Sequence, residues 1–302
     1  MKVATPSTAR HAVWRSPAKV NLCLRVVGRR RDGYHLLDSV FVPIDLCDEL
    51  AVTVEGVAGG APTRVEVRCD RAGVPQDASN LAARAAVALL AERGLGATVR
   101  IEIAKTIPPG TGLGGGSGNA ATMLRRMNEW LALAVAPARL REIALGLGAD
   151  VPFFLLGVPA RVRGIGEDVQ PIPGFPNLSL VVAIPPVAVS TAWAFRAFAE
   201  LVPSPATAGD EPAALAGGAP PAAPLLVNDL ERVVLPAFPV VAELKRLMLA
   251  SGARAAVMSG SGSAVVGLAG TGDEAAGIAA DLRRHAPEAA VHAVSGRVCG
   301  GG

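Results

Sequence analysis

Apolar and polar residues alternate near the start of the chain, over residues 13–27. One face of this segment carries Val20, Leu22, Leu24 and Val26. A period of two residues is typical of a half-buried β-strand. The pattern places Lys19 and Asn21 side by side on the face away from the core, where they can line a site. A lone exposed lysine is more often simply solvated, so the pattern alone leaves both interpretations open.

The same reasoning predicts more strands and several helices in the first half. Alternation predicts strands at 50–54, 65–67 and 99–103, and an alanine- and leucine-rich stretch predicts a helix over 80–93. A second helix is expected from Asn119 to Pro137, and its apolar stripe consists of Ala120, Leu124, Met127, Leu131 and Ala134. A third helix is expected over 138–145.

Composition shifts toward proline at 171–176, which we take as a domain boundary. The expected domains are therefore 1–170 and 171–302. Strands are predicted at 178–184 and 290–294, and helices around Thr191 and over 240–250 and 273–284. Residues 203–224 are too poor in large apolar groups to fold alone and are expected to form a mobile insertion. The fold class is α+β.

Bulk composition excludes several classes of protein. The 302 residues are 51% hydrophobic and 18% charged, and the net charge of +3 is too small to indicate a nucleic-acid surface. The four cysteines lack the CxxC spacing of a zinc site or a redox dithiol. Neither a signal peptide nor an apolar run of about 18 residues occurs, so we expect a cytoplasmic protein that does not enter a membrane.

A glycine-rich stretch, PPGTGLGGGSGNAA at 108–121, lies between a predicted strand and a predicted helix. Free amides at a helix N-terminus favour an anion, so this loop is expected to wrap a phosphate unless it is only a flexible linker. Gly110, Gly112 and Gly115 match GxGxxG, but no second strand ending in an acidic residue follows, as a dinucleotide site requires. The lysine of a P-loop and the protein-kinase motifs are absent as well.

Two further places carry candidate chemistry. Tyr34 and His35 follow a turn, where they could stack on and hydrogen-bond a ring or simply begin a strand. Asp150 precedes an apolar run, and spacing alone favours a helix cap and a catalytic carboxylate equally.

Three motifs together resemble those of the GHMP kinases: PAKVNL near the N-terminus, GLGGGSGNAA after a proline, and SGSGSA near the C-terminus. They occur in the family's order. The resemblance implies an N-terminal domain like ribosomal S5 domain 2, a ferredoxin-like C-terminal domain and a cleft between them. It also implies phosphoryl transfer from ATP to the hydroxyl of a small molecule.

The resemblance assigns roles to the ambiguous residues. Asp150 becomes the catalytic base toward the substrate hydroxyl, and Lys19 holds that carboxylate and the γ-phosphate in register. Lys105 could reach a phosphate or be solvated. The residues implied to bind ATP are Lys105, Pro108, Pro109, Gly110, Thr111, Gly112, Leu113, Gly114, Gly115, Gly116, Ser117 and Gly118.

Within the family, PAKVNLCLRVVGRRRDGYHLLDSV and LGADVPFFLLG are most similar to a kinase of non-mevalonate isoprenoid synthesis, whose substrate carries a cytidine diphosphate group. This implies that Tyr34 stacks on the cytosine, His35 hydrogen-bonds it, and Phe195 covers the other face, with Trp193 as a competitor. Asn21 and Thr191 are further expected substrate contacts.

One position departs from the family's loop, which usually carries two serines in succession, whereas here Ser117 is followed by Gly118. Mg²⁺ is expected because ATP chemistry uses it, although no carboxylate stands out as a ligand. The alternatives are another kinase of the family, acting on homoserine or mevalonate, and a non-catalytic nucleotide-binding protein. The Tyr34–His35 pair argues against the first alternative.

Overall fold

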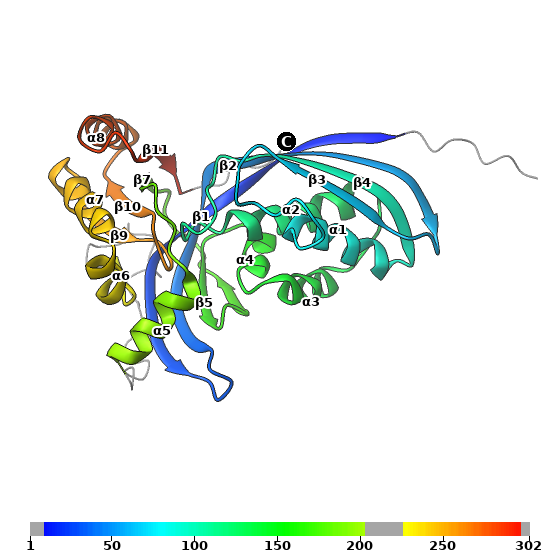
Figure 1. Cartoon of the computed structure of the whole chain (residues 1–302), viewed down its shortest axis with the longest axis horizontal. Coiled ribbons are helices and arrows are strands. Elements are labelled where there is room, and N and C mark those ends of the chain that lie inside the picture. The colour runs from blue at the N-terminus through cyan, green and yellow to red at the C-terminus, as the bar shows by residue number, and fades with distance from the viewer. Residues whose placement is uncertain (1–8, 203–225, 297–302) are drawn as a thin grey trace, which may run out of the picture. The chain divides into compact units, whose positions relative to one another are not determined.

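A computed structural model describes residues 9–202 and 226–296. These residues form a mixed set of helices and strands (Figure 1) that divides into two compact units. Unit 1 comprises residues 1–17, 47–109 and 115–155, and unit 2 comprises 18–46, 110–114 and 156–302. Each unit is discontinuous along the chain, whereas the boundary expected near residue 170 is a single cut. That boundary stays a prediction.

Two long strands contribute residues to both units: β1 (Arg10–Arg29) and β2 (His35–Gly59). The predicted strands at 50–54, 65–67 and 99–103 are confirmed as parts of β2, β3 (Arg64–Cys69) and β4 (Leu95–Ala104). In unit 1, β4 pairs antiparallel with β2 and parallel with β3. The register pairs Leu50 with Ile103 and Val52 with Ile101, so the apolar residues of neighbouring strands share one face.

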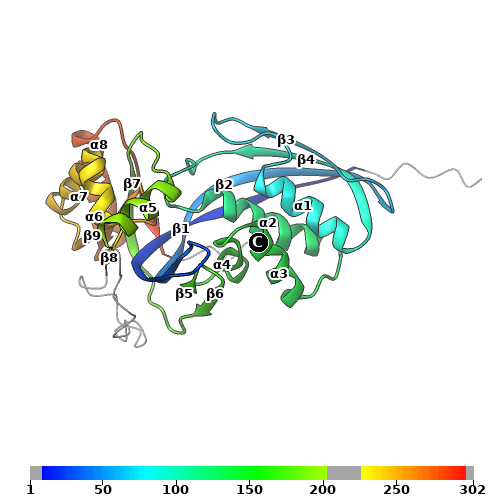
Figure 2. The same ribbon diagram turned by 60° about the horizontal axis from the view of Figure 1, so that its bottom comes forward.

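Helices cover this sheet in unit 1: α1 (Leu81–Glu92), α2 (Gly115–Trp130) and α3 (Pro137–Leu147). Figures 1 and 2 show all three on the same side of β3 and β4. A short helix, α4 (Val151–Leu156), follows. The side chain of Asn80 caps α1 by accepting a hydrogen bond from the backbone N–H of Ala82, at 2.9 Å, which agrees with the helix expected there.

The second helix differs at both ends from its prediction. It begins at Gly115 rather than Asn119, because burial of Gly118 and Asn119 outweighs the poor helix propensity of glycine. It ends at Trp130, so Leu131 and Ala134 lie beyond it. Pro137 does not end this helix but begins α3, where its missing N–H leaves no hydrogen bond unmade.

Unit 2 contains a four-stranded antiparallel sheet in the order β11-β7-β10-β9. Its strands are β7 (Ser179–Ile184), β9 (Ala255–Met258), β10 (Val265–Ala269) and β11 (Ala290–Ser295). The helices of this unit are α5 (Thr191–Leu201), α6 (Glu231–Ala237), α7 (Pro239–Ala250) and α8 (Gly272–His285). The core contains fully buried Val181, Met248 and Leu282.

Three short strands of unit 2 were not predicted. β5 (Ala160–Gly164) pairs with residues Leu37–Phe41 of β2, and β6 (Asp168–Pro171) pairs with β5. β8 (Val227–Asn228) runs parallel to β1. The glycines at 164 and 166 indicated only turns, because strands this short carry too little alternation to recognise. The insertion expected at 203–224 lies outside the described residues.

Candidate functional site

The middle of the glycine-rich loop, residues 110–114, packs closely against the chain at 259–264. The Thr111 carbonyl accepts a hydrogen bond from the Ala264 N–H at 3.1 Å, and the Gly112 carbonyl accepts one from the Ser259 hydroxyl at 3.1 Å. Gly112 has a φ of 76°, and a Cβ added there would meet the Ser259 carbonyl oxygen. Only glycine satisfies both conditions. Two of the three sequence motifs therefore meet at this point.

The third motif reaches the same loop through Lys19 in β1. The backbone N–H of Lys19 donates to the Leu113 carbonyl at 3.0 Å, and its ammonium donates to the Gly112 carbonyl at 2.9 Å. The ammonium also donates to Asn21 Oδ1 at 2.5 Å and lies 4.6 Å from the centre of the Phe41 ring. These contacts fix the position of the ammonium beside the loop.

The alternative that Lys19 is simply solvated is wrong. Lys19 is 3% exposed and Asn21 is 2% exposed, so β1 is covered on both faces here. The polar face is buried because each polar group on it finds a partner. A two-residue alternation distinguishes the two faces of a strand, but it does not show that the polar face meets water.

Two serines contact Asn21: Ser39, which no motif indicated, and Ser259, which belongs to the third motif. The Asn21 amide Nδ2 donates to Ser39 Oγ at 3.0 Å, and the Ser39 hydroxyl donates in turn to the Cys23 carbonyl. The Asn21 backbone N–H donates to Ser259 Oγ at 3.1 Å. Ser39 lies at a buried position of β2 between Asp38 and Val40. The sequence carries no signal for it, because its contact with Asn21 depends on how the two strands lie beside each other.

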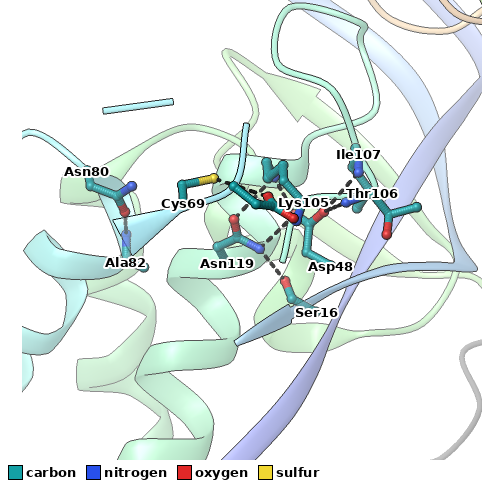
Figure 3. A network of polar contacts seen from close by, with 10 residues as sticks. Ser16, Asp48, Cys69, Asn80, Ala82, Lys105, Thr106, Ile107 and Asn119 are labelled. Atoms are coloured by element: carbon teal, nitrogen blue, oxygen red, sulfur yellow. Dashed lines mark hydrogen bonds and ion pairs between the residues drawn. The ribbon is translucent and has the colours of Figure 1, made fainter. Parts of the chain in front are cut away.

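In unit 1, the start of α2 lies over a buried ion pair between Lys105 and Asp48 (Figure 3). The side chains of Lys105 and Asp48 are 3% and 0% exposed, so the alternative of a solvated Lys105 is wrong. Its ammonium also donates to Asn119 Oδ1 at 3.3 Å. A Cβ added at Gly115 would lie 2.9 Å from this ammonium, which places the charge directly beneath the first turn of α2.

The Asp48 carboxylate forms hydrogen bonds both to the segment that follows β4 and to α2. Its Oδ1 accepts hydrogen bonds from the backbone N–H groups of Thr106 and Ile107 at 2.9 and 2.8 Å. Its Oδ2 accepts from the Asn119 amide at 3.0 Å, and the same amide donates to Ser16 Oγ at 2.9 Å. Figure 3 shows these groups converging on Asp48.

Asp48 was missed, yet the sequence held a signal for it. It occupies the register of the buried residues Leu46, Leu50 and Val52, at the same two-residue spacing in β2. A carboxylate in a core register requires a cation or several donors to offset its desolvation. This register therefore predicts a buried partner such as Lys105.

The first turn of α2 accounts for the departure at position 118. A Cβ added at Gly118 would lie 2.5 Å from the Pro17 carbonyl oxygen and 3.3 Å from Ser16 Oγ. A serine does not fit without a shift of the backbone at Pro17. Ser117 is partly buried and Gly116 is exposed, so the turn presents glycine backbone and one hydroxyl.

Asp150 lies in unit 1, partly buried, in the turn that immediately precedes α4. Pro152 occupies the first turn of α4, as predicted. The N–H of Val151 is bound to the Gly148 carbonyl at 3.1 Å. Lys19 belongs to unit 2, and its pairing with Asp150 stays a prediction.

The aromatic residues implied in substrate binding lie together in unit 2. The rings of His35 and Phe195 are stacked, with centroids 5.2 Å apart and planes at 24°. Tyr34 is 62% exposed, an uncommon setting for a large ring. Trp193 instead packs edge-on against Phe238, with ring centroids 5.3 Å apart, so it is Phe195 that lies beside His35.

The His35 ring has an unsatisfied buried atom, Nε2, which has no hydrogen-bond partner among the described residues. Burial and the nearby Arg29 lower the pKa of His35, so the ring is neutral near pH 7. A neutral imidazole can donate to or accept from a ligand. Thr191, at the start of α5, is exposed, and its hydroxyl lies 2.8 Å from Ser261 Oγ in the third motif.

Over 9–202 and 226–296, no group of three or more His, Cys, Asp or Glu side chains is arranged to hold a metal ion. In the same ranges, no helix combines the length and the apolar character needed to cross a membrane.

Comparisons with known proteins identify relatives over most of the chain. Residues 80–158 match the GHMP kinases N terminal domain, and residues 212–288 match GHMP kinases C terminal. The 4-diphosphocytidyl-2-C-methyl-D-erythritol kinase of Geobacter metallireducens is 43% identical over 268 residues, covering 89% of this chain and 92% of the relative. The protein of the same name from Geobacter sulfurreducens is 44% identical over 247 residues, covering 82% of this chain and 86% of the relative.

Solved structures agree with these relatives. A crystal structure of 4-(cytidine 5'-diphospho)-2C-methyl-D-erythritol kinase has a TM-score of 0.76 and 37% identity, and the match covers 96% of this chain and all of the other. A homoserine kinase from Cytophaga hutchinsonii has a TM-score of 0.68 at 18% identity, covering 99% of this chain and 96% of that one. The second likeness concerns the fold alone.

Proposed function

We propose that this chain, which belongs to the GHMP kinase family, transfers the γ-phosphoryl group of ATP to the 2-hydroxyl of 4-diphosphocytidyl-2-C-methyl-D-erythritol. The product is the 2-phosphate of this substrate, and the reaction serves non-mevalonate isoprenoid synthesis. Both relatives described above are more than two fifths identical to this chain over the aligned residues, and both carry the name of this enzyme. The remaining support comes from the site itself.

The observation that carries the proposal is the position of the Lys19 ammonium. Hydrogen bonds to Asn21 Oδ1 and to the Gly112 carbonyl hold it beside the glycine-rich loop. A fixed positive charge at this place can stabilise the oxygens of a transferring phosphoryl group, since phosphoryl transfer depends mainly on positioning and electrostatics. Lys19 is accordingly proposed to contact the γ-phosphate.

The loop and the first turn of α2 are proposed to hold the other phosphates. Backbone amides at 110–118 and the positive end of the α2 dipole supply donors for anionic oxygens. Lys105 lies beneath this turn, paired with Asp48, and its proposed part in phosphate binding is to support the turn from below. Asp150 is proposed to orient the substrate hydroxyl and to accept its proton.

Mg²⁺ is the metal expected with ATP. It would reduce the repulsion between the phosphates and an attacking hydroxyl. Phosphate oxygens and the Ser117 hydroxyl, in the first turn of α2, are hard oxygen donors of the kind that Mg²⁺ prefers, and we propose them as its ligands. We assign no protein carboxylate to the metal.

Selectivity is proposed to arise from the cytidine group of the substrate. Tyr34 offers an exposed ring for stacking on cytosine, and Phe195 offers a second ring. The Nε2 atom of His35 supplies a hydrogen-bonding group that has no partner of its own among the described residues. Asn21 and Thr191 remain proposed polar contacts.

The direct test is ADP release by the purified protein with ATP, Mg²⁺ and 4-diphosphocytidyl-2-C-methyl-D-erythritol. We expect turnover with this substrate and none with homoserine or mevalonate. Asp150→Asn should remove the turnover while leaving ATP binding in place, whereas a non-catalytic nucleotide-binding protein would not respond. Absence of substrate-dependent ADP release from the wild-type protein would refute the assignment.

A further inference from the structure

A row of hydrogen bonds runs from the Cys23 carbonyl to the Lys19 ammonium within unit 2. Ser39 donates its hydroxyl hydrogen to the Cys23 carbonyl, and Ser39 Oγ accepts from Asn21 Nδ2 at 3.0 Å. Asn21 Oδ1 then accepts from the Lys19 ammonium at 2.5 Å. The function proposed above uses Lys19 and Asn21 but gives Ser39 no part.

The direction of this row follows from which groups can donate. A carbonyl oxygen only accepts, and a serine hydroxyl has one hydrogen, so Ser39 donates its only hydrogen to the Cys23 carbonyl. Ser39 can therefore only accept from Asn21. This requirement turns the amide nitrogen of Asn21 toward Ser39 and the amide oxygen toward Lys19.

The opposite orientation of the amide is costly here. It would place the NH₂ group of Asn21 against the ammonium of Lys19, so that donor faces donor, and it would leave Ser39 Oγ without a hydrogen to accept. Ser39 is 1% exposed and Asn21 is 2% exposed, so water cannot replace the lost hydrogen bonds. Buried donors without acceptors lose the full value of their hydrogen bonds.

We infer that Ser39 is a positioning residue for phosphoryl transfer. It fixes the amide of Asn21, and the Asn21 oxygen in turn fixes the Lys19 ammonium beside the Gly112 carbonyl. This inference rests on the proposed function, because it assumes that the position of Lys19 matters to the reaction. The ordinary alternative is that Ser39 serves only to join β2 to β1 at Cys23.

The first test compares Ser39→Ala with wild type in steady-state turnover. We expect kcat to fall by about 10- to 100-fold, because a charge displaced by about 1 Å can cost that much. The KM for ATP should change little, and Ser39→Thr, which keeps the hydroxyl, should recover most of the rate. Ser251→Ala removes a hydroxyl bound to Asp281 elsewhere in unit 2 and serves as the matched control.

A double-mutant cycle separates positioning from stability. If Ser39 acts through Asn21, then Ser39→Ala should change kcat by less than about twofold in an Asn21→Ala background, since the effects of coupled residues are not additive. The same loss in both backgrounds would overturn the inference. The unfolding temperature of each variant shows whether a lower kcat results from a loss of stability.

The second test does not depend on activity. In a crystal structure of Ser39→Ala, we expect the Asn21 amide to turn or the distance from Lys19 Nζ to Asn21 Oδ1 to exceed about 3.5 Å. A Lys19–Asn21 contact as short as in wild type would overturn the inference. If the wild-type protein shows no turnover, the proposed function fails, and this structural comparison still decides whether Ser39 sets the position of Lys19.

Discussion

Two buried lysines, Lys19 in unit 2 and Lys105 in unit 1, are held in networks built on the same plan. Each ammonium donates to the Oδ1 atom of an asparagine, Asn21 for Lys19 and Asn119 for Lys105. The Nδ2 atom of that asparagine then donates to a serine hydroxyl, that of Ser39 or that of Ser16. In both places the asparagine is held by the serine and in turn holds the lysine ammonium in one position.

The networks differ in their remaining members. The second one includes the carboxylate of Asp48, which pairs with Lys105 and also accepts two backbone N–H groups at the end of β4. The first one includes the Gly112 carbonyl, which belongs to the glycine-rich loop itself. We therefore expect the Asp48 network to serve chiefly the stability of unit 1 and the Asn21 network to serve chiefly the reaction.

The largest expected effect is on stability, from Asp48→Asn. This change leaves the buried Lys105 ammonium without its carboxylate, and breaking a buried ion pair typically costs about 3–5 kcal/mol. Urea unfolding followed by circular dichroism measures the loss. Adding Lys105→Met should restore part of the stability because no uncompensated charge then remains. An Asp48→Asn protein as stable as wild type would remove the distinction between the two networks.

The next effect concerns catalysis, in the pair Lys19→Met and Lys105→Met. Loss of a group that stabilises transition-state charge commonly lowers kcat by about 10²–10³. We expect Lys19→Met to show this loss while it unfolds at a higher temperature than Lys105→Met does. Turnover measured beside thermal unfolding provides both readouts. Equal kcat values for the two variants would contradict the assignment of the chemistry to Lys19.

The third prediction concerns substrate affinity and changes Tyr34, a residue outside both networks. Tyr34→Ala should weaken binding of the cytidine substrate by about 1–3 kcal/mol, the usual value of a base stacked on an aromatic ring. ATP affinity should stay close to wild type, because Tyr34 lies in neither network. Isothermal titration with each ligand separately measures the two affinities. Equal losses for both ligands would argue against stacking on cytosine.

The smallest effect is on the reactivity of Cys23, at the closed end of the Asn21 network. Burial raises the pKa of the Cys23 thiol to about 11. At pH 8 only about one thiol in a thousand is then the reactive thiolate. We expect iodoacetamide to modify Cys23 far more slowly than the less buried Cys69, as measured by mass spectrometry. In denaturant the two cysteines should be modified at the same rate. Fast modification of Cys23 in the native protein would contradict the prediction, because it would mean that the thiol is accessible to solvent.

Patterns in the sequence located most elements but not the surroundings of the polar residues. Alternation found β1 and placed Lys19 next to Asn21 correctly, since it reports the pleat of a single strand. It could not show their burial, because the contacts of Asn21 come from other parts of the chain, Ser39 in the next strand and Ser259 in the third motif. The same holds for Lys105, whose partner Asp48 lies on another strand.

Helix ends were harder to predict than helix existence. The glycines at 115, 116 and 118 indicated a loop because glycine is a poor helix former, yet packing against Pro17 and Phe154 draws Gly118 into α2. Propensity is a local property, and close packing can override it. The roles of Lys19 and Asp150 came from the likeness of motifs and stay proposals, because spacing alone favoured a cap as much as a catalyst at Asp150.

The lack of space around Gly118 constrains how this enzyme can be engineered. A consensus design would copy the second serine of the family's usual loop into this position, as such designs do to gain stability. Here the new Cβ would lie 2.5 Å from the Pro17 carbonyl oxygen. A graft of the loop therefore requires the backbone at Pro17 to move away from α2, and no exchange of the side chain at position 17 removes the carbonyl oxygen.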